Sequence, residues 1–208
     1  MRIDLYGLVH KAQRYHLFAF VQQLGRANLD EPTQRAEIGA GVRDIVELLR
    51  DHADNEERYI HPLFANLGDG AAPLSREHHV LDERLAEVVA IVDMGRWEEL
   101  YRSVTRLTGE YLLHIDAEER AQAEVLWPNY EDSALAEVLT RFKAERAPAK
   151  AQSDLMLLLP ALNAKELAAL FHTMRGSVPV PRFQGAVELA QRALGSHRWS
   201  EVEAMLGG

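Results

Sequence analysis

The sequence predicts an all-α protein, with an up-down-up-down four-helix bundle over residues 1–130 and a C-terminal helical extension over residues 131–208. Apolar residues recur at steps of three and four along almost the whole chain, which is the period of an amphipathic helix. No alternating pattern bounded by turns predicts a strand. The first 130 residues contain four long segments of this kind joined by short turns, which favours antiparallel packing.

Turn signals delimit the four bundle helices. Pro32 suits the first turn of a helix, where its missing N–H needs no partner. The sequence GDGAAP at residues 68–73 predicts a loop, and Ser75 is a candidate N-cap for the helix that follows. Pro128 ends the last of the four. The expected helices span about residues 4–26, 32–67, 75–93 and 97–127.

The extension is more interrupted than the bundle. A helix is expected at about residues 132–146, and Asn163 followed by Glu166 has the spacing of a capping box. The proline-containing segment SVPVPR at residues 177–182 predicts a linker, with two further short helices. This acidic, amphipathic extension could cap the bundle, form a homodimer or bind a protein partner, and the sequence leaves these roles open.

Composition excludes several functions. The formal charge of −9, from 32 acidic and 23 basic residues, argues against nucleic acid or an anionic membrane as the main partner. The chain has no cysteine, so any metal must be bound by nitrogen and oxygen. The longest apolar run, at residues 155–162, is too short to cross a bilayer, and no hydrophobic signal core begins the chain. We therefore expect a soluble, cytoplasmic protein.

One histidine interrupts the inward-facing apolar stripe of each bundle helix. In chain order these are His10, His52, His78 and His114. On the second and fourth helices a glutamate follows four residues later, one turn further along the same face, at Glu56 and Glu118. The same spacing occurs at two other histidines outside any stripe, so the helical phase carries the prediction rather than the spacing alone.

The four histidines are also expected at one depth in the bundle. Two residues of an antiparallel hairpin lie level when they are equally far from its turn. The midpoint of His10 and His52 is residue 31, and that of His78 and His114 is residue 96, and both positions fall within predicted turns. The midpoint of the middle pair falls a few residues before the loop at 68–73. All four imidazoles can therefore share one layer.

Such a layer predicts a metal centre. A buried carboxylate costs several kcal/mol unless it is paired or bound to a cation, so two glutamates beside four imidazoles are an unfavourable way to build an inert core. Each glutamate can bridge two metals, and the six side chains then leave two octahedral ions about one position short each, once a solvent-derived bridge is added. Nitrogen and oxygen donors without sulfur suit iron or manganese, and also zinc if the geometry allows.

Other side chains are weaker candidates. His79 lies about 100° away from its neighbour around the helix and is expected off the stripe, as a second choice or an outer partner. His16 and His61 are candidate extra ligands, although a position on the bundle flank or at a helix end explains them as well. Tyr59 and Tyr111, each one turn from an expected ligand, could hydrogen-bond a bound ligand or simply pack in the bundle.

The motifs VHKAQR, HADNEERYIHPLF, EHHVLDERL and HIDAEER resemble those of the hemerythrin-like, or HHE cation-binding, domains. The resemblance covers about residues 1–130 and implies a four-helix bundle that holds a non-haem di-iron centre. It implies the same six residues as ligands, and dioxygen binding, nitric oxide or redox response, or iron sensing as functions. Oxygen-carrying members have a fifth histidine four residues after the third-helix ligand, where this chain has Asp82, so the resemblance does not predict reversible oxygen transport.

Three hypotheses follow from the sequence. The first is a binding or sensing module whose di-iron centre takes a small diatomic ligand or peroxide. The second is an oxidase or peroxide-consuming enzyme, which we rank lower because no histidine here has the glutamate three residues earlier that ferritin-like sites use. The third is a metal-free interaction protein whose polar layer only sets the bundle register.

Overall fold

The computed structural model describes residues 2–68 and 72–207, and all regular structure in this part of the chain is helical. The fold class predicted from the sequence is therefore confirmed. The chain divides into two compact units, Met1–Ala144 and Glu145–Gly208. The expected boundary at residue 130 precedes helix α7 (Asp132–Glu145), whose buried leucine and valine belong to an apolar cluster of the first unit.

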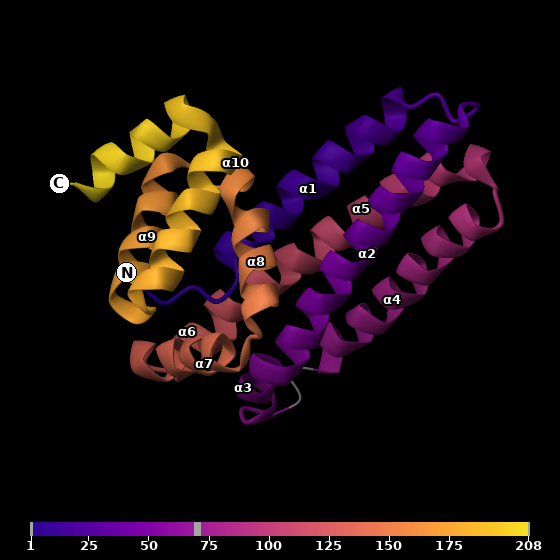
Figure 1. Cartoon of the computed structure of the whole chain (residues 1–208). Coiled ribbons are helices and arrows are strands. Elements are labelled where there is room, and N and C mark those ends of the chain that lie inside the picture. The colour runs from indigo at the N-terminus through magenta and orange to yellow at the C-terminus, as the bar shows by residue number, and fades with distance from the viewer. Residues whose placement is uncertain (1, 69–71, 208) are drawn as a thin grey trace. The chain divides into compact units, whose positions relative to one another are not determined.

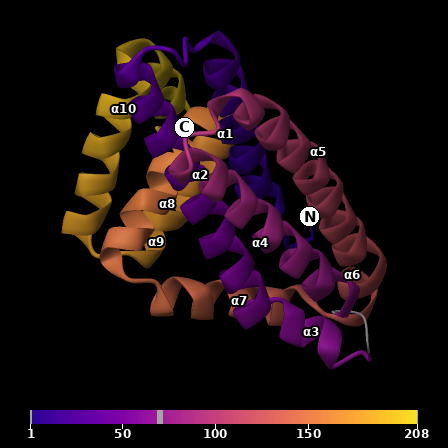
Figure 2. The same ribbon diagram turned by 90° about the vertical axis from the view of Figure 1, so that its right-hand side faces the viewer.

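Four long helices form the bundle of the first unit (Figure 1). They are α1 (Gly7–Arg26), α2 (Pro32–Tyr59), α4 (Ala72–Asp93) and α5 (Trp97–Ala121). Each packs against two others, so that α1, α2, α4 and α5 form a closed ring, and neighbours along the chain run in opposite directions (Figures 1 and 2).

Two apolar clusters fill the interior of this unit. The larger one draws on all four long helices, with members such as Leu17, Val42, Leu85 and Leu107. Each such side chain contributes roughly 1.5–3 kcal/mol when it leaves water. The second cluster contains Tyr6 and members of α2, α3 (His61–Ala65), α4 and α7. The buried polar layer of the bundle lies between these two clusters along the helices.

The second helix is shorter than predicted. It ends at Tyr59, and α3 begins at His61, so the expectation of one helix to residue 67 is wrong. Pro62 explains the break, because proline has no N–H for the carbonyl four residues earlier and its ring crowds that carbonyl. The first helix begins at Gly7 rather than residue 4, since the Asp4 carboxylate instead accepts the backbone N–H groups of Tyr6 and Gly7.

Helix α4 begins three residues before the expected start. Its first residue is Ala72 and Pro73 lies in its first turn, so Ser75 is inside the helix and is not an N-cap. Residues 69–71 of the predicted loop lie outside the described residues.

The fourth bundle helix continues past α5 through a π-helical turn, η2 (Gln122–Leu126), into α6 (Trp127–Asn129). The end near residue 127 was expected, whereas the π turn was not. The buried Gln122 side chain accepts the Leu5 N–H at 2.7 Å and donates to Asp4 at 3.0 Å. The side chain of Gln122, four residues after the buried Glu118, thus holds the segment that leads into α1 at the start of the wider turn.

The second unit contains α8 (Pro148–Ala161), α9 (Ala164–Ser177) and α10 (Val180–Leu206) around its own apolar cluster. The predicted capping box is present, because Asn163 and Glu166 each accept the other's backbone N–H. Helix α10 is kinked at Gly195, whose φ of 72° is accessible to glycine at little cost. Helix α8 has no counterpart among the predicted helices. No helix in the described part of the chain has the length and apolar character of a membrane span.

Candidate metal centre

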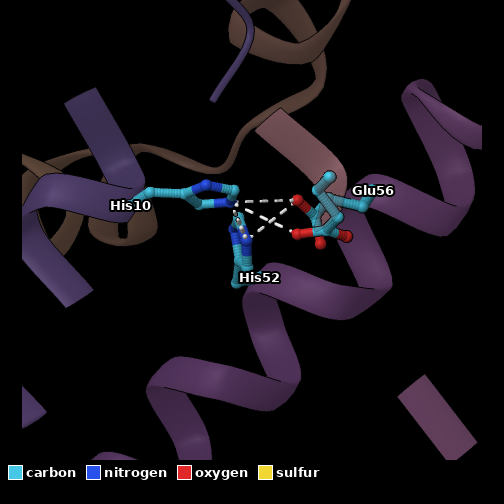
Figure 3. A group of neighbouring side chains, drawn as sticks. His10, His52 and Glu56 are labelled. Atoms are coloured by element: carbon cyan, nitrogen blue, oxygen red, sulfur yellow. Dashed lines mark hydrogen bonds and ion pairs between the residues drawn. The ribbon is translucent and has the colours of Figure 1, made fainter. Parts of the chain in front are cut away.

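The six side chains singled out by the sequence converge in one buried layer of the bundle. His10 comes from α1, His78 from α4, and α2 and α5 each supply a histidine and the glutamate one turn later. Figure 3 shows His10 and His52 pointing toward Glu56 from different helices. Glu56 is 1% exposed and Glu118 is fully buried, so both carboxylates lie out of contact with water.

Four of these residues form the first donor group. The Nε2 atoms of His10 and His52 are 3.2 Å apart. Oε1 of Glu56 lies 2.9 Å from His52 Nε2 and 3.5 Å from His10 Nε2. Oε2 of Glu118 lies 3.4 Å from His10 Nε2. Two nitrogens and two oxygens therefore surround one small space.

The second donor group lies on the other side of the same carboxylates. His78 Nε2 is 3.3 Å from Oε2 of Glu56 and 3.3 Å from Oε1 of Glu118. His114 Nε2 is 3.1 Å from Oε1 of Glu118. Each glutamate thus gives one oxygen to each group, and the two groups are related by these shared carboxylates.

The distances within each group fit a cation. With metal–ligand bonds of about 2.1 Å, adjacent ligands of an octahedral ion are roughly 3.0 Å apart. The observed separations of 2.9 to 3.5 Å lie near this value. Among the described residues, the carboxylates of Glu56 and Glu118 have no hydrogen-bond donor besides the imidazoles. Buried carboxylate oxygens paired with Nε2 atoms in this way match the donors of a metal site.

The electric field of the layer keeps the carboxylates charged. Burial alone raises the pKa of Glu56, but His52 and hydrogen bonds from His10 and His78 outweigh it and hold that pKa well below its usual value. Burial and the charge of Glu56 raise the pKa of Glu118, and the imidazoles of α4 and α5 again reverse the effect and lower it. The layer therefore contains two negatively charged carboxylates, which attract a cation or protonated imidazoles.

The imidazoles respond in the opposite direction. Burial lowers the pKa of His10, but hydrogen bonds to Glu119 and Glu56 outweigh it and raise the pKa to about 9. His78 is raised to about 10 in the same way, by hydrogen bonds to both buried glutamates that overcome its burial. The metal-free layer thus binds protons near neutral pH at positions where a cation would replace them.

Three further carboxylates contact the outer nitrogens, Nδ1, of three of the four imidazoles. His10 Nδ1 is 3.0 Å from Glu119, His78 Nδ1 is 3.0 Å from Glu57, and His114 Nδ1 is 2.8 Å from Glu77. Each of these carboxylates comes from a helix next to that of its histidine. When a cation replaces the inner proton, Nδ1–H still donates outward and the Nε2 lone pair would face the cation, as in carboxylate–histidine–metal arrangements.

Sequence reasoning missed these outer partners. Each one directly adjoins an inner residue in the chain, as Glu57 follows Glu56, Glu77 precedes His78 and Glu119 follows Glu118. Two glutamates in succession, or a glutamate next to a histidine, at a position of the apolar stripe form a signal that could have identified these outer partners. Which neighbouring helix each would reach depends on the rotation of the helices, which a one-dimensional pattern does not contain.

The other candidate histidines lie outside the two donor groups. The side chain of His79 is 78% exposed and contacts Glu83 on the surface. His16 lies beside Tyr15 on α1. His61 is buried behind the site, where its ring stacks on that of His78 with centroids 5.0 Å apart. Its Nδ1 meets Glu57 and Ser75, so His61 contacts the outer partner of His78.

The two tyrosines have different surroundings. Tyr59 packs among Arg58, Arg141 and Phe142 in the second apolar cluster. Tyr111 packs one turn before His114, and its buried hydroxyl has no hydrogen-bond partner among the described residues. Only the second of these phenols therefore remains a candidate to contact a bound ligand.

The fold and the donor set define a helical-bundle protein with histidine and carboxylate clusters suited to metal ions. Residues 3–126 match the family model of the hemerythrin HHE cation-binding domain, which is more than half of the chain. The chain belongs to this family, as its motifs predict. Searches of curated proteins and of solved structures find no match.

Proposed function

We propose that this protein binds two iron ions in the layer between α1, α2, α4 and α5 and uses the centre to bind or sense a small molecule. One observation carries the proposal. The two oxygens of Glu56 face different pairs of imidazoles, and so do the two oxygens of Glu118. A single cation would need only one such group, whereas two adjacent cations account for both groups and for both bridging carboxylates.

The donor set suits iron. Each cation would have two imidazole nitrogens and two carboxylate oxygens, which leaves two of six octahedral positions for solvent or a small ligand. Manganese suits the same donors, whereas zinc prefers four ligands and gains less from the shared carboxylates. When bound, iron supplies redox chemistry and affinity for dioxygen, nitric oxide or peroxide, and the protein supplies the ligands and fixes their orientation.

Reversible oxygen transport is not the function we propose. Oxygen-carrying hemerythrins have a further histidine at the position of Asp82, and here that side chain turns to the surface and accepts from Arg50 Nε at 2.6 Å. Binding or sensing of dioxygen, nitric oxide, redox state or iron remains compatible with the six inner ligands.

Metal analysis together with spectroscopy tests this function. Purified protein loaded with ferrous iron under nitrogen should hold two irons per chain and change its near-ultraviolet and visible absorption on addition of dioxygen, peroxide or nitric oxide. An iron-loaded protein whose spectrum responds to none of them would contradict the proposal. Sustained turnover of peroxide that is lost in Glu56→Ala would instead favour the alternative of a peroxide-consuming enzyme.

A further inference from the structure

A cavity of 280 Å³ opens beside the metal layer, between α2 and α4, and reaches α5. Its outer end is polar and includes the ion pair of Arg50 with Asp82, which links the two helices. Its inner end is bounded by His52, His78 and His114, which belong to both donor groups. The cavity therefore connects the surface to both halves of the centre.

Beside the three histidines, three leucines and one tyrosine line the cavity, and its remaining lining is mostly polar. Leu49, Leu81 and Leu85 line it, each of them buried in the larger apolar cluster. Leu49 and Leu81 are each three residues from a ligand histidine, which places them one helical turn from the metal layer. Tyr111, three residues before His114, completes this lining. Among the described lining residues, Tyr111 is the buried polar residue that is not part of either donor group.

The hydroxyl of Tyr111 is available as a donor. The residue is 4% exposed, and its oxygen has no hydrogen-bond partner in the described part of the chain. In the metal-free protein, burial and then the charges of Glu56 and Glu118 raise the pKa of Tyr111 well above its usual value. A buried hydroxyl without a partner costs free energy, which a ligand accepting its hydrogen bond would recover.

We propose that this cavity is the chamber for the small ligand of the centre, and that the Tyr111 hydroxyl donates a hydrogen bond to that ligand. The chamber would then favour anions of two or three atoms with a lone pair away from the metal, such as azide or hydroperoxide. The inference rests on the proposed function, because it assumes cations in the adjacent donor groups. Apolar side chains with a few polar groups that converge on one point are the usual construction of a small-molecule site, and here the three leucines and Tyr111 lie beside the ligand histidines.

Tyr6 provides a matched control. It is fully buried, its hydroxyl likewise has no partner among the described residues, and the same two carboxylates raise its pKa after burial. Its ring stacks on His10 at 4.9 Å, but it does not line the cavity. Tyr6→Phe and Tyr111→Phe therefore remove the same group from similar surroundings, and of the two residues only Tyr111 lines the cavity.

The test is an azide titration of iron-loaded protein, followed by charge-transfer absorption and by the infrared stretch of bound azide. We expect Tyr111→Phe to bind azide at least tenfold more weakly than wild type and to shift the azide stretch, because a hydrogen bond to a charged acceptor is lost. Tyr6→Phe should match wild type in both. Iron content and metal-free thermal unfolding should be unchanged or improved in both variants, since neither hydroxyl has a protein partner.

Each contrary outcome has a distinct meaning. Equal azide affinity and an equal stretch in Tyr111→Phe and wild type would overturn this inference while leaving the di-iron proposal standing. An equal loss in Tyr6→Phe would also overturn it, since the effect would not come from the chamber. Iron-loaded wild type that binds no azide would refute the chamber as an anion site. A wild-type protein that holds no iron would refute both proposals.

Discussion

The outer carboxylates allow the two donor groups to be weakened separately. Glu119 contacts His10, which belongs to the first group, whereas Glu57 and Glu77 contact His78 and His114 of the second. Replacement of any of the three by glutamine keeps the side-chain length and removes the charge that orients its imidazole. We therefore expect Glu119→Gln to weaken one cation, and Glu57→Gln or Glu77→Gln to weaken the other.

The size of the effect follows from the exposure of these groups. Loss of an outer partner typically lowers metal affinity about 10- to 100-fold, which is about 1.4 to 2.8 kcal/mol. The side chains of Glu119, Glu57 and Glu77 are 34%, 43% and 47% exposed, so solvent screens part of each interaction. Glu119 also pairs with Arg14 at 2.8 Å. We expect each single change to lie near the lower limit, at about tenfold.

The assay is calorimetric titration of metal-free protein with ferrous or manganous ions, resolved into two binding steps. Glu83→Gln is the control, because Glu83 lies on α4 like Glu77 and contacts a histidine, but that histidine is exposed and outside the site. The control should bind both cations as wild type does. If Glu119→Gln and Glu77→Gln weakened both steps equally, or neither, the assignment of separate donor groups would be wrong.

Three further results are expected. Glu118→Ala should abolish tight binding of both cations, seen as loss of metal by elemental analysis, because its oxygens face both groups; retention of one cation would contradict a bridging role. Since the pKa values of His10 and His78 are raised to about 9 and about 10, metal-free protein carries both protons at pH 7 and a cation must displace them. Metal affinity should therefore rise with pH from 7 to 9, with proton release measured by calorimetry in buffers of different ionisation heat, and a pH-independent affinity would argue against it. Asn163→Ala should cost the second unit about 1 kcal/mol of unfolding free energy in urea, through loss of the capping box, and a change in metal content would show that the two units are not independent.

The sequence was sufficient for the bundle and for the convergence of the inner six side chains. The apolar stripe gives the phase of each helix, and the midpoint rule gives relative depth, because short turns leave an antiparallel pair little freedom. His10 and His52 are the clearest case, since the turn between their helices is short and their Nε2 atoms lie 3.2 Å apart. The helical phase and the midpoint rule together thus predicted that two residues 42 positions apart in the chain lie side by side.

Other features depended on information that a stripe does not contain. Pro62 ends α2 early, although the apolar period continues through it, because the period records the face and not the backbone hydrogen bonds. His61 is consequently directed against the ring of His78 rather than along the stripe of α2. The outer carboxylates lie beside the stripe, where contact with a neighbouring helix depends on the rotation of both helices. The partnership of Glu77 with His114 is an example.

Anomalous diffraction at the iron edge from crystals of iron-loaded protein tests the central claim most directly. The account predicts two peaks within the bundle, about 3.5 to 4 Å apart as in other two-metal sites, with Glu56 and Glu118 between them and two imidazoles at each. A single peak in the layer, or iron bound elsewhere with the six side chains left as they are, would contradict the account.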